Sequence, residues 1–272
     1  MIVLNEKIIR SLKEKHGVNY DEKIIRIELL KYCDANKADD LLSKWSAFLN
    51  KLYSIEKNCL LGLKQVWYKL PVIFRDCCFF KNKLVIDVGG MCGLTSFWIS
   101  ELGCARRVVM LDAGVNFCRC LSTACQEISV KNIEARTGRF ENFFNPKNLK
   151  EDVSDASFEK CLYMSDILYQ IEKDIKVLEL VKNSLSLFDL VVVHSRENNT
   201  KPRHPRRGEG HKNKLGFYKN IYSYLNTGEC KVYYPWHTSD FLKNIRSDIE
   251  YPSRIEFEYA SKTYITVIRE KF

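Results

Sequence analysis

Apolar residues recur at helical spacing in the first part of the chain. In the clearest case, over 38–56, the apolar side chains form one stripe of a helix with about 3.6 residues per turn, namely Leu41, Leu42, Trp45, Phe48, Leu49, Leu52 and Tyr53. Asp39 and Asp40 lie near its start, where carboxylates favour the helix dipole. Similar patterns predict helices over 24–32, capped by Asn19 or Asp21, and over 59–69. We therefore expect a helical N-terminal extension over residues 1–78.

Beyond residue 78 the pattern changes to short apolar, β-branched runs at helix-sized intervals. The runs are 83–88, 107–112, 132–137, 160–164 and 189–194, and helical stretches lie between them at 95–102, 116–128 and 172–184. This alternation predicts an α/β domain over 79–272 with a parallel sheet. Two further runs, 254–259 and 263–269, are joined by residues 260–262 and predict a C-terminal antiparallel hairpin.

Composition narrows the class of protein. The chain has 272 residues, of which 46% are hydrophobic and 28% charged, which is typical of a folded globular protein. A chain of this size does not need disulfides, so we expect its 11 cysteines to be reduced thiols. They form no paired C-x-x-C units, so we expect no zinc site. The sequence after Met1 does not read as a targeting segment, and no run of about 18 apolar residues follows. We therefore expect a cytoplasmic protein with no membrane association.

A glycine-rich loop follows the first predicted strand. Asp87 ends that strand, and Gly89, Gly90 and Gly93 come before the next helix. Glycines at such a turn let the backbone bend sharply and let a ligand approach closely. Asp112 ends the following strand, where a carboxylate can accept hydrogen bonds from two ribose hydroxyls. The spacing predicts a nucleotide-cofactor site, and the alternative is a tight turn that holds no ligand.

A dinucleotide-binding dehydrogenase is a second interpretation of the same loop. Such enzymes carry Gly-x-Gly-x-x-Gly, in which the last glycine lies five places after the first. Here Gly93 lies only four places after Gly89, and the predicted antiparallel tail is also untypical of that class. Both features count against a dehydrogenase.

The segment 85–112, together with Ser165-Asp166-Ile167-Leu168-Tyr169 after the fourth strand, resembles the class I S-adenosylmethionine-dependent methyltransferases. That family has an acidic-x-Gly-x-Gly-x-Gly loop, an acidic residue after the second strand, and often Asp-x-Leu-Tyr after the fourth. The resemblance implies a Rossmann-like, mostly parallel seven-stranded sheet ending in an antiparallel hairpin, with S-adenosylmethionine as cofactor. It covers 81–194 well and 230–272 loosely, whereas the first 80 residues match no family.

The resemblance also implies which residues bind the cofactor. In chain order they are Asp87, Gly89, Gly90, Gly93, Asp112, Arg139, Phe140 and Ser165. The glycine-rich loop would hold the methionine end, the carboxylate of Asp112 the ribose, and segment 137–140 the adenine. Ser165 and Asp166 would line the reaction cleft.

This chain departs from the family pattern at three points. Met91 stands where the middle glycine of the loop is usual. Arg139 stands where an acidic residue often follows the third strand, which leaves adenine recognition to backbone groups. The metal-binding carboxylates of catechol-type enzymes are not recognisable, so we expect no metal.

Methyl transfer from a sulfonium is an in-line displacement, so the protein must align donor and acceptor. A general base can assist when the acceptor has a proton to lose. His194, after the fifth strand, has a suitable intrinsic pKa, and the alternative is that it only hydrogen-bonds a loop. Asp166 and Tyr169 follow the fourth strand and are further catalytic candidates, although Asp166 could instead position the methionine amino group or an acceptor amine.

The basic segment 201–214 carries six Lys or Arg side chains and one Glu, and so over half of the chain's net charge of +9. Arg side chains suit phosphate or carboxylate groups, so we expect Arg196, Arg203, Arg206 and Arg207 to bind an anionic acceptor. Basic residues followed by aromatic ones also suit single-stranded nucleic acid. A solvated lid with no ligand is the remaining alternative.

Three functional hypotheses follow. The first is methyl transfer to an O or N atom of a small polar acceptor, anionic or sugar-like, with the N-terminal helices covering the cleft. The second is an RNA methyltransferase that grips its substrate with the basic segment and the N-terminal helices. The third is an inactive, methyltransferase-like binding module. We favour the first, because the sequence after the fourth strand is more typical of small-molecule enzymes than of base-amine methyltransferases.

Overall fold

A computed structural model describes residues 3–16, 20–62, 80–139, 158–165, 187–196, 230–233 and 264–270. The chain begins with three α-helices, α1 (Glu6–His16), α2 (Glu22–Leu29) and α3 (Ala35–Ile55), followed by a 3-10 helix, η1 (Lys57–Gly62). Within these ranges no helix is both long enough and apolar enough to cross a membrane. The helix predicted over 59–69 is the 3-10 helix η1 as far as residue 62, and residues 63–69 lie outside the described residues.

The start of α3 differs from the prediction by one turn. Asp34 is the N-cap residue, and its carboxylate accepts the backbone N–H of Lys37 at 2.9 Å. The helix therefore begins at Ala35, before Asp39 and Asp40. Those two carboxylates form ion pairs instead, Asp39 with Arg26 of α2 at 2.6 Å and Asp40 with a lysine one turn on. Asp21 caps α2, as one of the two predicted alternatives.

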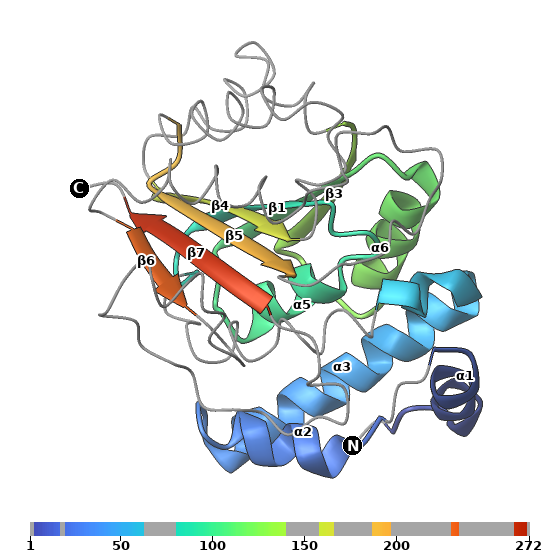
Figure 1. Cartoon of the computed structure of the whole chain (residues 1–272). Helices are drawn as coiled ribbons and strands as arrows, with labels where there is room; N and C mark the ends of the chain where they lie inside the picture. Colours follow the sequence, from blue (N-terminus) through green and yellow to red (C-terminus); the bar gives the residue numbers. More distant parts are fainter. Residues whose placement is uncertain are drawn as a thin grey trace.

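The remaining elements form a mixed α/β structure (Figure 1). The strands are β1 (Leu84–Val88), β2 (Arg107–Asp112), β3 (Ile133–Thr137), β4 (Lys160–Ser165), β5 (Leu190–Arg196), β6 (Cys230–Tyr233) and β7 (Tyr264–Glu270). They lie in the order β3-β2-β1-β4-β5-β7-β6. The pairs among β1 to β5 are all parallel. The predicted α/β class with a parallel sheet is confirmed.

The C-terminal strand has two antiparallel neighbours. β7 pairs with β5 along its whole length and with β6 over Thr266–Arg269. The second antiparallel neighbour of β7 is therefore β6, at 230–233. The hairpin prediction gave this place to 254–259, a segment that lies outside the described residues. β6 was not predicted, because a four-residue run of mixed polarity carries too little pattern. The predicted helix over 172–184 also lies outside the described residues.

Two helices connect the first three strands, α5 (Leu94–Glu101) and α6 (Val115–Glu127). Figure 1 shows α3 running beneath them on one side of the sheet. Trp45 of α3 is fully buried, with its ring centroid 5.1 Å from that of Phe97 and 5.0 Å from that of Trp98, both in α5. Such aromatic pairs add about 0.5–1.5 kcal/mol each to simple area burial. The N-terminal helices thus share one hydrophobic core with the sheet domain.

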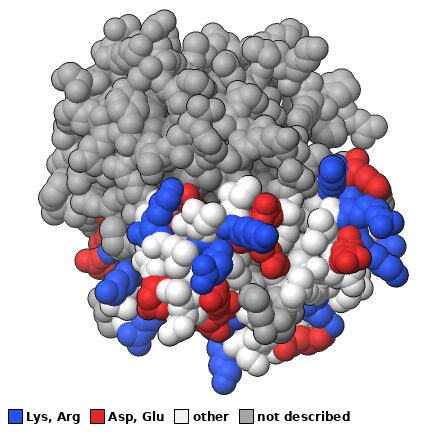
Figure 2. Space-filling model, turned by 90° about the horizontal axis from the view of Figure 1, so that it is seen from below, with Lys and Arg blue, Asp and Glu red and all other residues white. Residues whose placement is uncertain are grey.

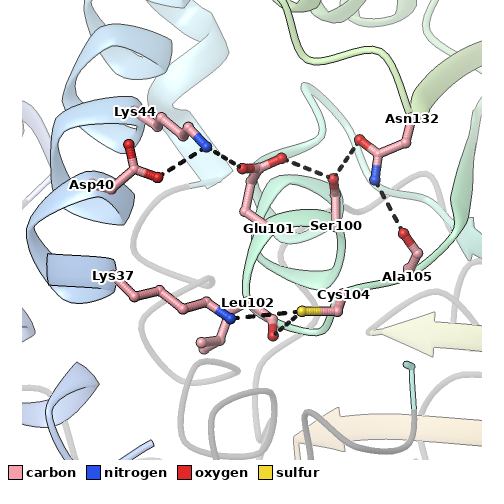
Figure 3. Close-up of polar contacts among 9 residues, drawn as sticks. All are labelled: Lys37, Asp40, Lys44, Ser100, Glu101, Leu102, Cys104, Ala105 and Asn132. Carbon is pink, nitrogen blue, oxygen red and sulfur yellow. Dashed lines mark hydrogen bonds and ion pairs between the residues drawn. The ribbon is translucent and has the colours of Figure 1, made fainter. Parts of the chain in front are cut away.

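Polar contacts fix the same interface at the end of α5 (Figure 3). Lys44 of α3 lies between Asp40 and Glu101, with Nζ–O distances of 3.0 Å and 3.3 Å. Beside it, Ser100 donates its hydroxyl to the side-chain oxygen of Asn132 at 2.8 Å, which connects α5 to the residue before β3. The predicted boundary at residue 78 lies outside the described residues, and a cap over the cleft stays a prediction.

Candidate functional site

The carboxyl ends of the parallel strands meet along one edge of the sheet. Val88 is the register partner of Leu111 in β2 and of Met164 in β4. Ser165, at the end of β4, is likewise the partner of His194 in β5. Strand order reverses between β1 and β4, because β2 and β3 follow on one side and β5 on the other. In open α/β sheets, ligands bind at such a switch point, beyond the carboxyl ends of the strands.

The glycine-rich loop, residues 89–93, lies at this switch point and has a strongly turned backbone. Gly89 and Gly93 have φ angles of 72° and 71°, in the left-handed region that favours glycine. A Cβ on Gly93 would lie only 2.5 Å from a side-chain carbon of Leu121, and a Cβ on Gly90 the same distance from one of Met110. Gly90 and Gly93 are therefore required for the loop to pack on β2 and α6.

Asp87 supports the loop from within the core. Its side chain is only 1% exposed, and its Oδ2 accepts the hydroxyl of Ser96 at 2.5 Å. This bond ties the first turn of α5 to the end of β1. Gly93 is the N-cap residue of α5 and supplies no side-chain cap. The N–H groups and partial positive charge of that helix end therefore face the carboxyl edge of the sheet.

Asp112, at the end of β2, is held by two backbone amides. Its Oδ2 accepts the N–H of Met91 at 3.0 Å, and its Oδ1 accepts the N–H of Gly114 at 2.8 Å. The residue is only partly buried. Because each carboxylate oxygen has two lone pairs, one on each remains for a ligand. The result is an oriented acceptor with two oxygens, directly beside the glycine-rich loop.

Val115 is an exposed apolar residue close to Asp112 in the chain, and the sequence analysis did not single it out. It is the first residue of α6, immediately after the glycine that hydrogen-bonds Asp112, and it is 64% exposed. Periodicity alone reads such a valine as a core residue. Its exposure adds an apolar surface to the polar edge formed by the loop and Asp112.

The other predicted site residues divide into two groups. Ser165, His194 and Arg196 lie in the described strands β4 and β5, so their backbones belong to the same edge, and Arg139 follows β3 with an exposed side chain. Phe140, Asp166, Tyr169, Arg203, Arg206 and Arg207 lie outside the described residues. The structure thus brings the loop, Asp112, Ser165 and His194 together along one edge.

The outer face of the N-terminal helices carries charges of both signs. Residues 3–16 and 20–62 contain eleven Lys or Arg and nine Asp or Glu side chains. Figure 2 shows basic and acidic side chains interleaved on the described part of the view from below. Ion pairs such as Arg26–Asp39, in which the side chains are 39% and 45% exposed, join charges of opposite sign. A nucleic-acid backbone is bound by concentrated basic charge. The described N-terminal helices do not present it on this face.

The sequence matches no known protein family and no curated protein. Among solved structures, the chain is similar to EvdMO1, with 12% identity and a TM-score of 0.44 over 74% of this chain and 40% of that one. It is also similar to the O-methyltransferase TomG from Streptomyces achromogenes in complex with SAM, with 11% identity and a TM-score of 0.48 over 80% of this chain and 89% of TomG.

A third similar structure is an rRNA methylase from Streptococcus thermophilus, with 11% identity and a TM-score of 0.43 over 74% of this chain and 96% of that one. The chain spans only 40% of the length of EvdMO1 and 35% of that of WbdD, which is also similar. Because all these TM-scores lie below 0.5, we base the function on the strand order and the geometry of the site.

Proposed function

We propose that this chain is an S-adenosylmethionine-dependent methyltransferase. The observation that carries the proposal is the pairing of the glycine-rich loop with the clamped carboxylate of Asp112 at the switch point of the sheet. Dinucleotide-binding sheets have the strand order 3-2-1-4-5-6. Here an antiparallel β7 lies between β5 and β6, which counts against a dehydrogenase and agrees with the fold that the sequence resemblance implies.

The residues present fit this cofactor at three points. The two oxygens of Asp112 suit a pair of ribose hydroxyls, since each can accept one further hydrogen bond. The uncapped start of α5 suits a carboxylate such as that of the methionine moiety. The exposed side chain of Val115 suits the flat face of the adenine. When bound, the cofactor supplies a methyl group activated by a positively charged sulfur.

For the acceptor, we propose an O or N atom of a small polar molecule, anionic or sugar-like. His194 is the proposed general base, and Arg196 a proposed acceptor-binding residue. Support comes from their position in β5, whose end adjoins Ser165 of β4 at the edge that would receive the cofactor. Asp166, Tyr169 and the basic segment 201–214 remain candidates for acceptor binding on sequence grounds.

Isothermal titration of the full chain with S-adenosylhomocysteine and with NAD⁺ tests the cofactor. We expect the first to bind and the second not to bind. Asp112→Ala should weaken binding at least about tenfold, since hydrogen bonds to a charged group contribute about 1.5–3 kcal/mol. Asp40→Ala, on the surface of α3, is the matched control and should bind like the wild type. Binding of NAD⁺ alone, or of neither ligand, would contradict the proposal.

The salt dependence of turnover separates the acceptor classes. Binding to a phosphate backbone releases counterions, so the affinity for RNA falls steeply as salt rises. We expect methyl transfer to a small acceptor, with a rate that varies little between low and physiological salt. Turnover of RNA with a steep salt dependence would replace the small acceptor by RNA, while cofactor binding without any turnover would support an inactive module.

A further inference from the structure

A lysine of α3 and a cysteine between α5 and β2 lie in contact on the surface of the molecule (Figure 3). The Nζ of Lys37 donates to the Sγ of Cys104 over 3.7 Å, although the two residues are 67 positions apart in the chain. Both residues are exposed. Of the eight cysteines that the structure describes, only Cys104 is exposed, whereas Cys33 is half-buried and the other six are buried. The contact therefore puts an accessible thiol beside an accessible amine.

Backbone hydrogen bonds fix the positions from which the two side chains extend. In the first turn of α3, the carboxylate of Asp34 accepts the N–H of Lys37 at 2.9 Å. The backbone carbonyl of Cys104 accepts the N–H of Asn82 at 3.0 Å, and its thiol donates to the carbonyl of Leu102 over 3.5 Å. Lysine carries its amine on a flexible four-carbon stem. Rotation of side-chain bonds alone can therefore bring the nitrogen of Lys37 onto the sulfur of Cys104.

We propose that Lys37 and Cys104 are a redox modification site, at which a peroxide joins the two side chains by a reversible S–N bond. Reactive cysteines are exposed and lie in electropositive surroundings, which the amine of Lys37 supplies here. Once oxidised to the sulfenic acid, a cysteine condenses with a neighbouring thiol or nitrogen. Because the amine belongs to α3 and the thiol follows α5, the bond fastens the N-terminal helices to the sheet domain. The proposal does not depend on the cofactor.

The reaction consumes one hydrogen peroxide and proceeds in two steps. The sulfur of Cys104 attacks one peroxide oxygen, so that an S–O bond forms, the O–O bond breaks, and the leaving hydroxide takes the thiol proton to become water. Lys37 gives its ammonium proton to solvent, and its nitrogen then attacks the sulfur. The S–N bond forms, the S–O bond breaks, and the leaving hydroxide takes a second proton from nitrogen to become water. The side-chain pair loses two electrons, and the peroxide is reduced to two waters.

Peroxide treatment of the reduced full chain, followed by intact mass, peptide mapping and thermal unfolding, tests the proposal. We expect a mass lower by about 2 Da, from the loss of two hydrogens, and a peptide that links Lys37 to Cys104. A dithiol reductant should reverse both, because it returns hydrogen to sulfur and nitrogen and becomes a cyclic disulfide. A link across 67 residues restricts the unfolded chain, so the midpoint of thermal unfolding should rise by roughly 5–10 °C.

Four variants assign the bond to these two side chains. Cys104→Ser removes the thiol, and Lys37→Arg keeps the positive charge but replaces the amine by a guanidinium, so each should abolish the link and the rise in the unfolding midpoint. Cys33→Ser removes the half-buried cysteine, and Lys44→Arg changes a lysine of the same helix whose amine lies between two carboxylates. These two are the matched controls and should cross-link like the wild type.

Several results would overturn the proposal. A disulfide from Cys104 to another cysteine, or an oxygen adduct of Cys104 without a link to Lys37, would show that the amine does not take part. A linked peptide that is heavier by one oxygen would exclude the S–N bond. A Lys37–Cys104 link that leaves the unfolding midpoint unchanged would show that the bond does not fasten the N-terminal helices.

Discussion

The backbone N–H of Met91 donates to Oδ2 of Asp112 over 3.0 Å, so the tip of the glycine-rich loop is bonded to the end of the neighbouring strand. Met91 reaches this position with a φ of 52°, in the left-handed region that non-glycine residues rarely adopt. Such strain persists where the surrounding structure imposes it, which is common at functional sites. The orientation of the proposed ribose acceptor therefore depends on the conformation of one strained residue.

Substitution of Met91 should separate backbone strain from side-chain contacts. Glycine adopts a φ of 52° freely, so Met91→Gly should leave the free energy of unfolding unchanged or raise it by up to about 1 kcal/mol. Met91→Val should lower it by about 1–3 kcal/mol, because a β-branched side chain fits this region poorly. Urea denaturation of both variants measures the difference. Equal stabilities would show that Met91 is not strained.

Asp112→Asn should reduce both stability and cofactor binding. The amide group replaces one acceptor oxygen by a donor, which then faces the N–H of Met91 or Gly114. Leaving one such donor unpaired costs about 1–3 kcal/mol of unfolding free energy. Asp40→Asn is the control, because it removes a surface ion pair worth at most about 1 kcal/mol. If Asp112→Asn were as stable as Asp40→Asn, the two backbone amides would not hold the Asp112 carboxylate.

Trp45 should hold the N-terminal helices to the sheet domain. Trp45→Ala removes a fully buried ring that packs on Phe97 and Trp98, and should lower the free energy of unfolding by about 3–5 kcal/mol. Its Nε1 is buried without a hydrogen-bond partner among the described residues, so Trp45→Phe should cost much less. Thermal unfolding followed by two spectroscopic probes checks both variants. A separate transition for the N-terminal helices in the wild type would contradict a shared core.

Glu134, in the outermost strand β3, should make the stability of the fold depend slightly on pH in the acid range. Burial raises the pKa of Glu134, but hydrogen bonds and charge from Arg136 and Arg107 outweigh it, so the pKa lies below its usual value of 4.5. A carboxyl with a lowered folded-state pKa stabilises the fold above its unfolded pKa, and this contribution is lost as pH falls through the folded value.

Glu134→Gln should therefore be less stable than the wild type near neutral pH, by no more than about 1 kcal/mol because the group is partly exposed. The difference should shrink as pH falls below 4.5. Denaturation of both proteins across this range measures it, with Glu6→Gln, an exposed acid of α1, as control. A difference that does not change with pH would show that the two arginines do not stabilise the charged form.

The sequence by itself determined the core strands, the two connecting helices and the position of Asp112. The runs ending at Val88 and Asp112, and the helices that follow them, appear in the structure within one or two residues of the predicted bounds. The physical reason is local: apolar and β-branched periodicity and glycine spacing are properties of a few neighbouring residues. The glycine-rich loop could be recognised in the same way.

Only the tertiary structure decided how distant residues meet. The pairing of β7 with β6, the exposure of Val115 and the clamp on Asp112 all join or orient residues from different elements. No local pattern encodes them, since each depends on which faces pack together once the sheet has formed. The sequence thus indicated a cofactor loop, and the folded chain put a fixed carboxylate beside it.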